Sequence, residues 1–252
     1  MQPLSVAIIT YNEEKNILHC LKTLKGIVDE IVVIDSFSTD NTKAICLEWG
    51  VRFIEKQFTG YGLQKRYATD QATHDHVINL DADEFLSEAL IISIQEEKSK
   101  NFPYDGYTMN RLNRFGDQWI RHGSWYPDRK LRLFNRKKGN WTDKIVHEDL
   151  QMQPGSTLKH LKGDLMHNAY KNSSEYKLKN EKYSSLSAQS LFMNGKKTNV
   201  FNLLMNPVWA FVKSYFILLG FLDGRNGFII AKQIAEMAYK KHHKLLQLQK
   251  NP

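Results

Sequence analysis

Strand-like and helix-like segments alternate over the first hundred residues, and this alternation limits the possible folds more than any other feature. Short β-branched apolar runs are each followed by a stretch in which apolar residues recur three and four positions apart, the spacing of one helix face. We expect strands at 5–10, 30–36, 51–55 and 76–80 and helices at 14–24, 39–50, 62–73 and 87–100. Strand–helix units in this order predict an α/β fold with a doubly wound, mostly parallel sheet.

The pattern changes after residue 104, where loops rich in glycine, aspartate and tryptophan join strands that lack intervening helices. We expect these strands at 105–115, 129–136, 145–152 and 157–170. They predict a mixed or antiparallel extension that completes the sheet. From residue 173 onward the chain reads as helical. We therefore predict a first domain over residues 1–170 and a C-terminal helical region over residues 171–252.

Polar residues follow three of the predicted parallel strands, at the edge where doubly wound sheets bind their ligands. They are the turn Thr10, Tyr11, Asn12 and Glu13, then Asp35, and then Asp81 with Asp83. An acidic residue in the position of Asp35 can accept hydrogen bonds from a ribose or a base. The alternative is that Asp35 only caps the helix that follows it.

Asp81, Asp83 and Glu84 place three carboxylates within four residues. Like charges this close disfavour each other's ionisation. A hard divalent cation, Mg²⁺ or Mn²⁺, would offset the repulsion and would also bind substrate phosphates. The alternative is a solvated acidic loop before a helix whose N-terminal dipole favours carboxylates. Spacing alone does not decide between the two.

Four ordered segments resemble glycosyltransferase family 2, which has the GT-A fold. They read "SVAIITYNEEKNILHCLKTL", "DEIVVIDSFSTDNT", "GLQKRYATDQATHDHVINLDADE" and "IVHEDL". The resemblance covers about residues 4–170 and is strongest to the bacterial branch that contains lipopolysaccharide inner-core β-1,4-glucosyltransferases. It is specific for fold and reaction class and weaker for the sugar.

The resemblance implies a role for each matching position. Residues that match the nucleotide-sugar site are Thr10, Tyr11, Glu13, Asp35, Lys65 and Asp81. Asp83 matches the carboxylate that binds the metal ion directly, and His167 matches a histidine that some GT-A enzymes add to the metal shell. By residue type alone, a histidine such as His167 is more often packed or solvent-facing than a metal ligand. Phe37 departs from the pattern, because the family usually has a small residue there.

Direct displacement of a nucleoside diphosphate inverts the anomeric centre and needs a base on the opposite side of the sugar. Glu148 and Asp149 lie where related enzymes place that base, although such a pair is also typical of a protein surface. Successive side chains of a strand face opposite ways, so only one can serve, and we expect Glu148. Arg129 and Arg132 are interpreted either as offsetting diphosphate charge or as solvated.

The C-terminal segment carries most of the net charge of +8, because residues 196–252 contain nine lysine and arginine residues and two acidic ones. These charges accompany long apolar runs, which Pro207 and Lys213 interrupt. The combination predicts an interfacial anchor on an anionic membrane surface and disfavours nucleic acid as a partner. The alternative is a helical cap over the enzyme's own core, or a dimer seam.

A hydrophobic content of 42% excludes a disordered chain, and the two cysteines are expected to stay unpaired in a reducing cytosol. The first residues lack the pattern of a cleavable leader, so we expect a cytoplasmic protein, peripheral on the inner face of a bacterial cell membrane. The expected function is inverting, metal-dependent transfer of a hexose, with glucose expected, from a UDP-sugar to a glycolipid or polysaccharide acceptor such as the lipopolysaccharide core. The alternatives are a catalytically inactive membrane scaffold of the same fold and a glycoside hydrolase with paired carboxylates.

Overall fold

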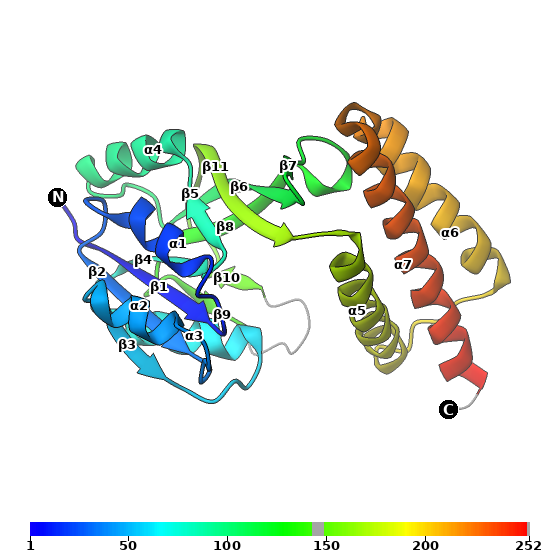
Figure 1. The fold of residues 1–252 in the computed structure, drawn as a ribbon, viewed down its shortest axis with the longest axis horizontal. Coiled ribbons are helices and arrows are strands. Elements are labelled where there is room, and N and C mark those ends of the chain that lie inside the picture. Colours follow the sequence, from blue (N-terminus) through cyan, green and yellow to red (C-terminus); the bar gives the residue numbers. More distant parts are fainter. Residues whose placement is uncertain (143–148, 251–252) are drawn as a thin grey trace. The chain divides into compact units, whose positions relative to one another are not determined.

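The protein's structure is a computed structural model that describes residues 1–142 and 149–250. The predicted alternation of strands and helices is confirmed (Figure 1). Its elements are β1 (Leu4–Thr10), α1 (Ile17–Leu24), β2 (Glu30–Asp35), α2 (Thr42–Glu48), β3 (Arg52–Glu55), α3 (Tyr61–Gln71), β4 (His76–Asp81), β5 (Glu84–Leu86) and α4 (Glu88–Ser99).

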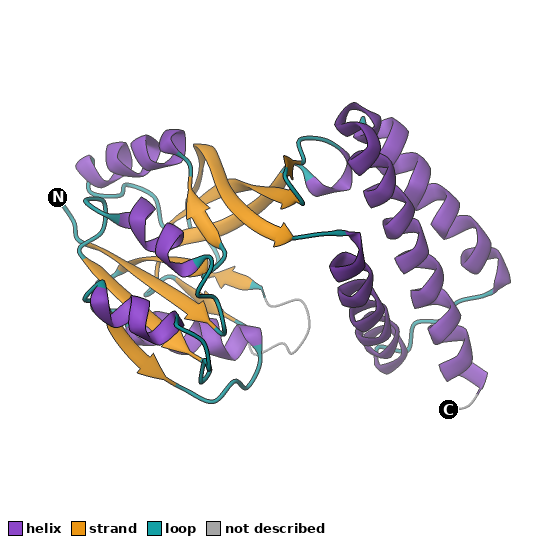
Figure 2. Cartoon of the chain, viewed as in Figure 1, coloured by secondary structure: helices purple, strands orange, loops and turns teal. Residues whose placement is uncertain are grey.

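The following segment is rich in strands, as expected, with one short 3₁₀ turn (Figure 2). Its elements are β6 (Gly106–Phe115), β7 (Gln118–Trp119), η1 (Gly123–Trp125), β8 (Asp128–Asn135), β9 (Gly139–Trp141), β10 (Leu150–Met152) and β11 (Leu158–Tyr170). The strand expected at 145–152 is seen from Leu150, as half of the β9–β10 hairpin, while residues 145–148 lie outside the described part.

The main sheet runs in the order β3-β2-β1-β4-β8-β6-β11-β5. Strands β3, β2, β1 and β4 are mutually parallel, whereas β8 is antiparallel to β4 and β5 is antiparallel to β11. The predicted α/β fold, a mostly parallel doubly wound sheet with a mixed extension, is therefore confirmed.

Helices cover both faces of the parallel strands, which explains why β1 is buried along its whole length. Val6 and Ile8 point into a core formed with α1, α2 and α4. Ala7 and Ile9, the alternate residues, pack against Ala68 of α3 on the opposite face. Because side chains alternate along a strand, this continuous apolar run serves two cores at once.

The chain divides into two compact units, residues 1–111 with 129–167 and residues 112–128 with 168–252. The second unit therefore includes a segment, 112–128, that the sequence assigned to the first domain. The functional division of the chain into residues 1–170 and 171–252 stays a prediction.

Three long helices make up most of the second unit, as the sequence predicts. The elements are α5 (Ser173–Met193), α6 (Val200–Val212), the π-helical turn η2 (Lys213–Ile217), the 3₁₀ turn η3 (Gly220–Asp223) and α7 (Gly224–Lys250). Phe115, Ile120, Tyr176 and Ile230 form its main buried cluster. No single helix in the described chain is long and apolar enough to cross a membrane, whereas Val200–Ile217 and Gly220–Lys250 meet those criteria together, as a pair bent by 73°.

Candidate active site

The carboxyl ends of β1, β2 and β4 lie side by side. Thr10 is in register with Asp35, and Ile9 is in register with Asp81. Two backbone hydrogen bonds extend this contact past the strand ends, because Ser36 N donates to Thr10 O (3.0 Å) and Ala82 N donates to Ile9 O (3.2 Å). The structure therefore brings three of the predicted nucleotide-site positions, Thr10, Asp35 and Asp81, to one edge of the sheet.

Asp35 is fully buried and holds the loop after β2. Its carboxylate accepts hydrogen bonds from the backbone N–H of Ser38 (2.7 Å) and from the Ser38 hydroxyl (2.5 Å). The same hydroxyl lies 2.8 Å from Asn12 N, which donates to it, so the loops after β1 and β2 are joined. Asp35 therefore shapes the turn within its own loop, and it makes no cap to α2 in this network.

Two aromatic side chains project from these joined loops. Tyr11 is 57% exposed and Phe37 is 51% exposed. Phe37 has a φ of +62°, in the left-handed region that a bulky residue rarely adopts. This backbone geometry explains why a small residue is usual at that position, since glycine adopts it without strain. Exposed, strained residues of this kind cluster at ligand sites.

Glu13 and Thr10 have largely structural surroundings. The backbone N–H of Glu13 donates to the Thr42 hydroxyl (2.8 Å), and its carboxylate accepts from the Asn16 amide (2.7 Å), so Glu13 fixes the turn between β1 and α1. The Thr10 hydroxyl is buried and has no hydrogen-bond partner within the described residues. It lies at the carboxyl end of β1, at the same edge of the sheet as Asp35 and Asp81.

Asp81, the first carboxylate of the acidic stretch, is neutralised by two cations of the protein. Lys65 Nζ lies 3.0 Å from each of its carboxylate oxygens, and Arg132 Nη2 lies 3.2 Å from Oδ2. Both basic side chains are almost fully buried, and Asp81 keeps 25% of its side chain exposed. Asp81 therefore carries a matched charge that borders solvent.

Glu84 completes a buried charge network beneath Asp81. Its Oε1 lies 2.8 Å from Arg132 Nη2 and 3.2 Å from Arg111 Nη1. Burial alone would raise the pKa of Glu84, but the positive charges of Arg132 and Arg111 outweigh it and hold the pKa well below its usual range. The interpretation of Arg132 as solvated is wrong, because this residue is 3% exposed and paired with protein carboxylates.

Asp83, the second carboxylate, faces a histidine instead of these cations. His167 Nε2 lies 3.4 Å from Asp83 Oδ2, and both side chains are about one-fifth exposed, 17% for His167 and 22% for Asp83. The pairing of β11 with β5 produces this contact, since His167 is in register with Glu84. Asp81 and Glu84 thus share Arg132, whereas Asp83 lies beside His167, so each carboxylate of the stretch has a basic side chain next to it that offsets the repulsion.

Close packing of β11 on α4 fixes the register that places His167. Gly163 has a φ of +90°, and a Cβ on it would lie 2.3 Å from Leu90 N, so only glycine fits this approach. Ser87 accepts from Leu90 N (3.3 Å) as the N-cap of α4 and also from Asp164 N (3.0 Å) of β11. His167 lies three residues further along the same strand.

Asp83 and His167 fit a divalent metal ion as a pair of ligands. A carboxylate oxygen and an imidazole nitrogen suit Mn²⁺, and Mg²⁺ is usually held by one or two carboxylates with substrate phosphates and water. Within residues 1–142 and 149–250, no group of three or more His, Cys, Asp and Glu side chains could hold a metal ion. The remaining positions would therefore fall to phosphate oxygens and water.

The expected base is not described by the structure. Glu148 lies within residues 143–148, outside the described part. Asp149 is exposed, its backbone N–H donates to the Thr142 hydroxyl (3.3 Å), and its carbonyl accepts from Thr142 N (2.9 Å). The choice of Glu148 over Asp149 stays a prediction.

Trp141 is a residue of this site that the sequence analysis did not identify. Its ring lies 4.9 Å from Lys65 Nζ and 5.7 Å from Arg132 Cζ, and its Nε1–H donates to Asn79 Oδ1 (2.7 Å). Cation–π contacts of this kind orient both basic side chains toward Asp81. The only signal in the sequence was the concentration of tryptophan between residues 119 and 141.

Comparison with known proteins agrees with this geometry. The family described as Glycosyl transferase family 2 matches residues 5–153. An uncharacterized glycosyltransferase of Rickettsia typhi is 32% identical over 261 residues, covering 98% of this chain and 88% of that protein. The lipopolysaccharide core biosynthesis glycosyltransferase LpsC of Rhizobium meliloti is 30% identical over 253 residues, covering 95% of this chain and 93% of LpsC.

One similar solved structure is glucosyl-3-phosphoglycerate synthase from Mycobacterium tuberculosis, in complex with Mn²⁺ and UDP-glucose. It has a TM-score of 0.37 and 20% identity, covering 45% of this chain and 44% of that one, which is too low to transfer a ligand. The family match, by contrast, spans more than half of the chain, and the two curated relatives cover nearly all of it. The chain therefore belongs to glycosyltransferase family 2 and is a glycosyltransferase of the GT-A fold.

Proposed function

We propose that this glycosyltransferase transfers a hexose, with glucose the expected sugar, from a UDP-sugar to the lipopolysaccharide core or another surface glycan, with inversion and with Mg²⁺ or Mn²⁺. The observation that carries the proposal is the separation of Asp83 from Asp81. Asp81 is compensated by Lys65 and Arg132, whereas Asp83 lies 3.4 Å from His167. This arrangement places one carboxylate beside one imidazole, a pair that suits a cation accompanying a diphosphate.

The nucleotide would lie over the edge formed by β1, β2 and β4. Tyr11 and Phe37 offer exposed rings for a base, and the Thr10 hydroxyl offers an unused polar group. Lys65, held against Asp81 and the Trp141 ring, supplies positive charge at the same edge. Protein contacts orient the Lys65 side chain before the substrate arrives, so binding requires little further ordering of that side chain.

For the chemical step, a metal ion bound by Asp83 and His167 would supply Lewis-acid neutralisation of the departing diphosphate. Glu148 is proposed as the base that accepts the proton of the acceptor hydroxyl as that oxygen attacks the anomeric carbon. Attack from the side opposite the leaving group inverts the configuration. Asp149, one residue away, would face elsewhere if the segment is extended.

The acceptor and the location are proposed on the relatives and the charge distribution. LpsC, named for lipopolysaccharide core biosynthesis, aligns with nearly the whole chain. The basic, apolar C-terminal segment supports a peripheral position on the cytoplasmic face of a bacterial membrane, where a glycolipid acceptor would be within reach. The glycoside hydrolase alternative has no support from the family match.

The direct test is a screen of nucleotide sugars with the purified full chain, with Mn²⁺ or with a chelator. We expect release of UDP from UDP-glucose that depends on the metal and increases with a lipopolysaccharide-core acceptor, and a product of inverted configuration by proton NMR. Binding of UDP and Mn²⁺ without turnover of any sugar would favour the inactive scaffold. Equal turnover in the chelator would overturn the metal dependence.

A further inference from the structure

The helix α6 presents an apolar surface that the other described elements of its own unit leave exposed. None of its thirteen residues is buried. The apolar side chains that are at least 46% exposed on it are Val200, Phe201, Leu204, Met205, Val208 and Trp209. Exposed apolar patches of this extent mark interaction sites for proteins, ligands or membranes.

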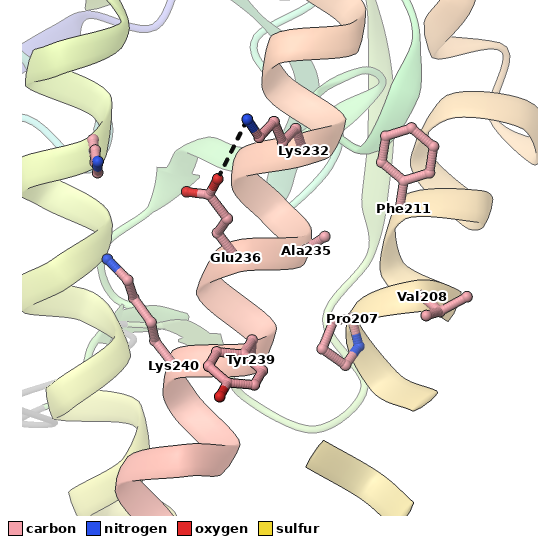
Figure 3. A pocket seen from close by; sticks show the side chains of 9 residues that line it. Pro207, Val208, Phe211, Lys232, Ala235, Glu236, Tyr239 and Lys240 are labelled. Carbon is pink, nitrogen blue, oxygen red and sulfur yellow. Dashed lines mark ion pairs between the residues drawn. The ribbon is translucent and has the colours of Figure 1, made fainter. Parts of the chain in front are cut away.

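An open groove of about 590 Å³ continues this surface, with α7 as its floor. Its volume lies within the range of small-molecule sites. Pro207, Val208 and Phe211 of α6 line one side, and Lys232, Glu236 and Lys240 extend from the other side of α7 (Figure 3). Apolar atoms therefore form almost all of the groove's lining, and the charged groups of these side chains border it.

The charged groups that border the groove have a positive surplus that an anion could use. Lys240 forms an ion pair with Glu181 of α5. Hydrogen bonds from Lys240 and Lys244 lower the pKa of Glu181 to about 2, so its carboxylate stays ionised. Lys232 lies 3.9 Å from Glu236, with 63% of its side chain exposed, and surface pairs this long contribute little. Lys177 of α5 also lines the groove and is exposed. Lys232 and Lys177 are thus the cations best able to meet a phosphate.

We propose that this groove binds one anionic phospholipid of the membrane, with an acyl chain along Pro207, Val208 and Phe211 and the phosphate at Lys232 and Lys177. The exposed face of α6 then enters the apolar part of the same leaflet. The proposal rests on the proposed membrane association and deepens it by naming the lipid class and the residues.

Charge complementarity selects the lipid over a second copy of this chain. A symmetric dimer through the groove would bring together two surfaces with the same positive surplus, which like-charge repulsion disfavours. An anionic lipid fits both the apolar lining and its basic border, because its head is negative and its tail apolar. Interfacial helices bind membranes by the same combination of apolar insertion and basic residues.

The first experiment measures flotation of the full chain with phosphatidylcholine vesicles, with and without phosphatidylglycerol. We expect the double variant Lys177→Gln/Lys232→Gln to weaken binding to phosphatidylglycerol vesicles about tenfold or more, since each lysine near an anionic surface contributes about a fivefold factor. The matched control is Lys241→Gln/Lys250→Gln, which removes the same charge from α7 outside the groove lining. Equal losses in both variants would mean a general charge effect and overturn the site.

The second experiment tests the apolar contact. Brominated lipids should quench the fluorescence of Trp209, which is 59% exposed on α6, and Trp209→Phe should remove that quenching. Val208→Asp, at an exposed position of the groove, should abolish vesicle binding without unfolding the chain. Calorimetry with short-chain phosphatidylglycerol should give one site, whereas glycerol phosphate should not bind.

Two further outcomes contradict the inference. Light scattering that shows a dimer broken by Val208→Asp would make a second copy the occupant. Absence of vesicle binding would also overturn it. Because the variants lie on α5, α6 and α7, binding of UDP and Mn²⁺ is measured in parallel on each of them. In the variants, lost lipid binding with intact nucleotide binding is the expected result. In the unchanged chain, absent lipid binding with intact nucleotide binding would count against the lipid site alone, and the reverse would count against the proposed transfer reaction.

Discussion

His167 Nε2 lies 3.4 Å from Asp83 Oδ2, although 84 positions separate the two residues in the chain. The pairing of β11 with β5 and the close packing of Gly163 on α4 produce this contact. Both side chains are partly exposed, so a cation and a diphosphate could reach them. The pair is the most specific functional feature of the described structure.

Asp83→Asn should lower kcat about 10²-fold or more, because the metal ion that neutralises the leaving diphosphate would lose its carboxylate ligand. His167→Gln should raise the Mn²⁺ concentration needed for half-maximal activity with a smaller loss of kcat. The measurement is a Mn²⁺ titration of UDP release. The control is His160→Gln, at an exposed position of the same strand. This variant should need the same Mn²⁺ concentration for half-maximal activity as the unchanged protein. An unchanged Mn²⁺ requirement in His167→Gln would leave His167 only as a partner of Asp83.

Glu148→Gln should lower kcat about 10²-fold or more while UDP-sugar binding stays nearly unchanged, since the amide keeps the shape but cannot accept the proton. Asp149→Asn is the matched control and should have a milder effect. Steady-state kinetics and calorimetry on both variants separate turnover from binding. If Asp149→Asn is inactive and Glu148→Gln is normal, the assignment is wrong by one residue. Full activity of both would place the base elsewhere.

Arg132→Met should destabilise the protein by about 3–5 kcal/mol, because it leaves the buried carboxylate of Glu84 without its shortest ion pair, 2.8 Å long. Urea unfolding followed by circular dichroism measures this change. Adding Glu84→Gln removes the stranded charge and should recover part of the loss. A double-mutant cycle that shows no coupling between the two sites would contradict the network.

The free energy of unfolding should fall as the pH is lowered from about 7.5 to 5.5. Burial lowers the pKa of His76 below its ordinary value of 6.5, so the folded state keeps the ring neutral. As the pH falls, His76 binds a proton in the unfolded state before it does so in the folded state. The stability that the neutral ring contributes is complete above the pKa of the unfolded state and is lost as the pH falls to the pKa of the folded state. His76→Phe keeps the stacking on Phe102 and should flatten this dependence. The measurement is the urea midpoint of unfolding at several pH values in this range. If the midpoint of His76→Phe depends on pH as strongly as that of the unchanged protein, other groups cause the effect.

The sequence by itself determined the order of strands and helices in the first hundred residues, apart from the short strand β5, and the edge of the sheet that carries Thr10, Asp35 and Asp81. These features follow from local periodicity and from the rule that the carboxyl ends of parallel strands share one edge. The sequence also limited the chemistry, because two aspartates with one residue between them at the end of a strand suit a divalent cation.

Only the tertiary structure decided how the charges at that edge are divided. Arg132, interpreted from sequence as a solvated residue or a diphosphate contact, lies buried between Asp81 and Glu84, and Trp141 packs against it. Those contacts depend on β8 and the β9–β10 hairpin returning to strands that are more than fifty positions away in the chain. Local patterns report which face of an element is apolar, but they carry no information about register between distant strands. That register separates Asp81, matched by two cations, from Asp83, which faces His167.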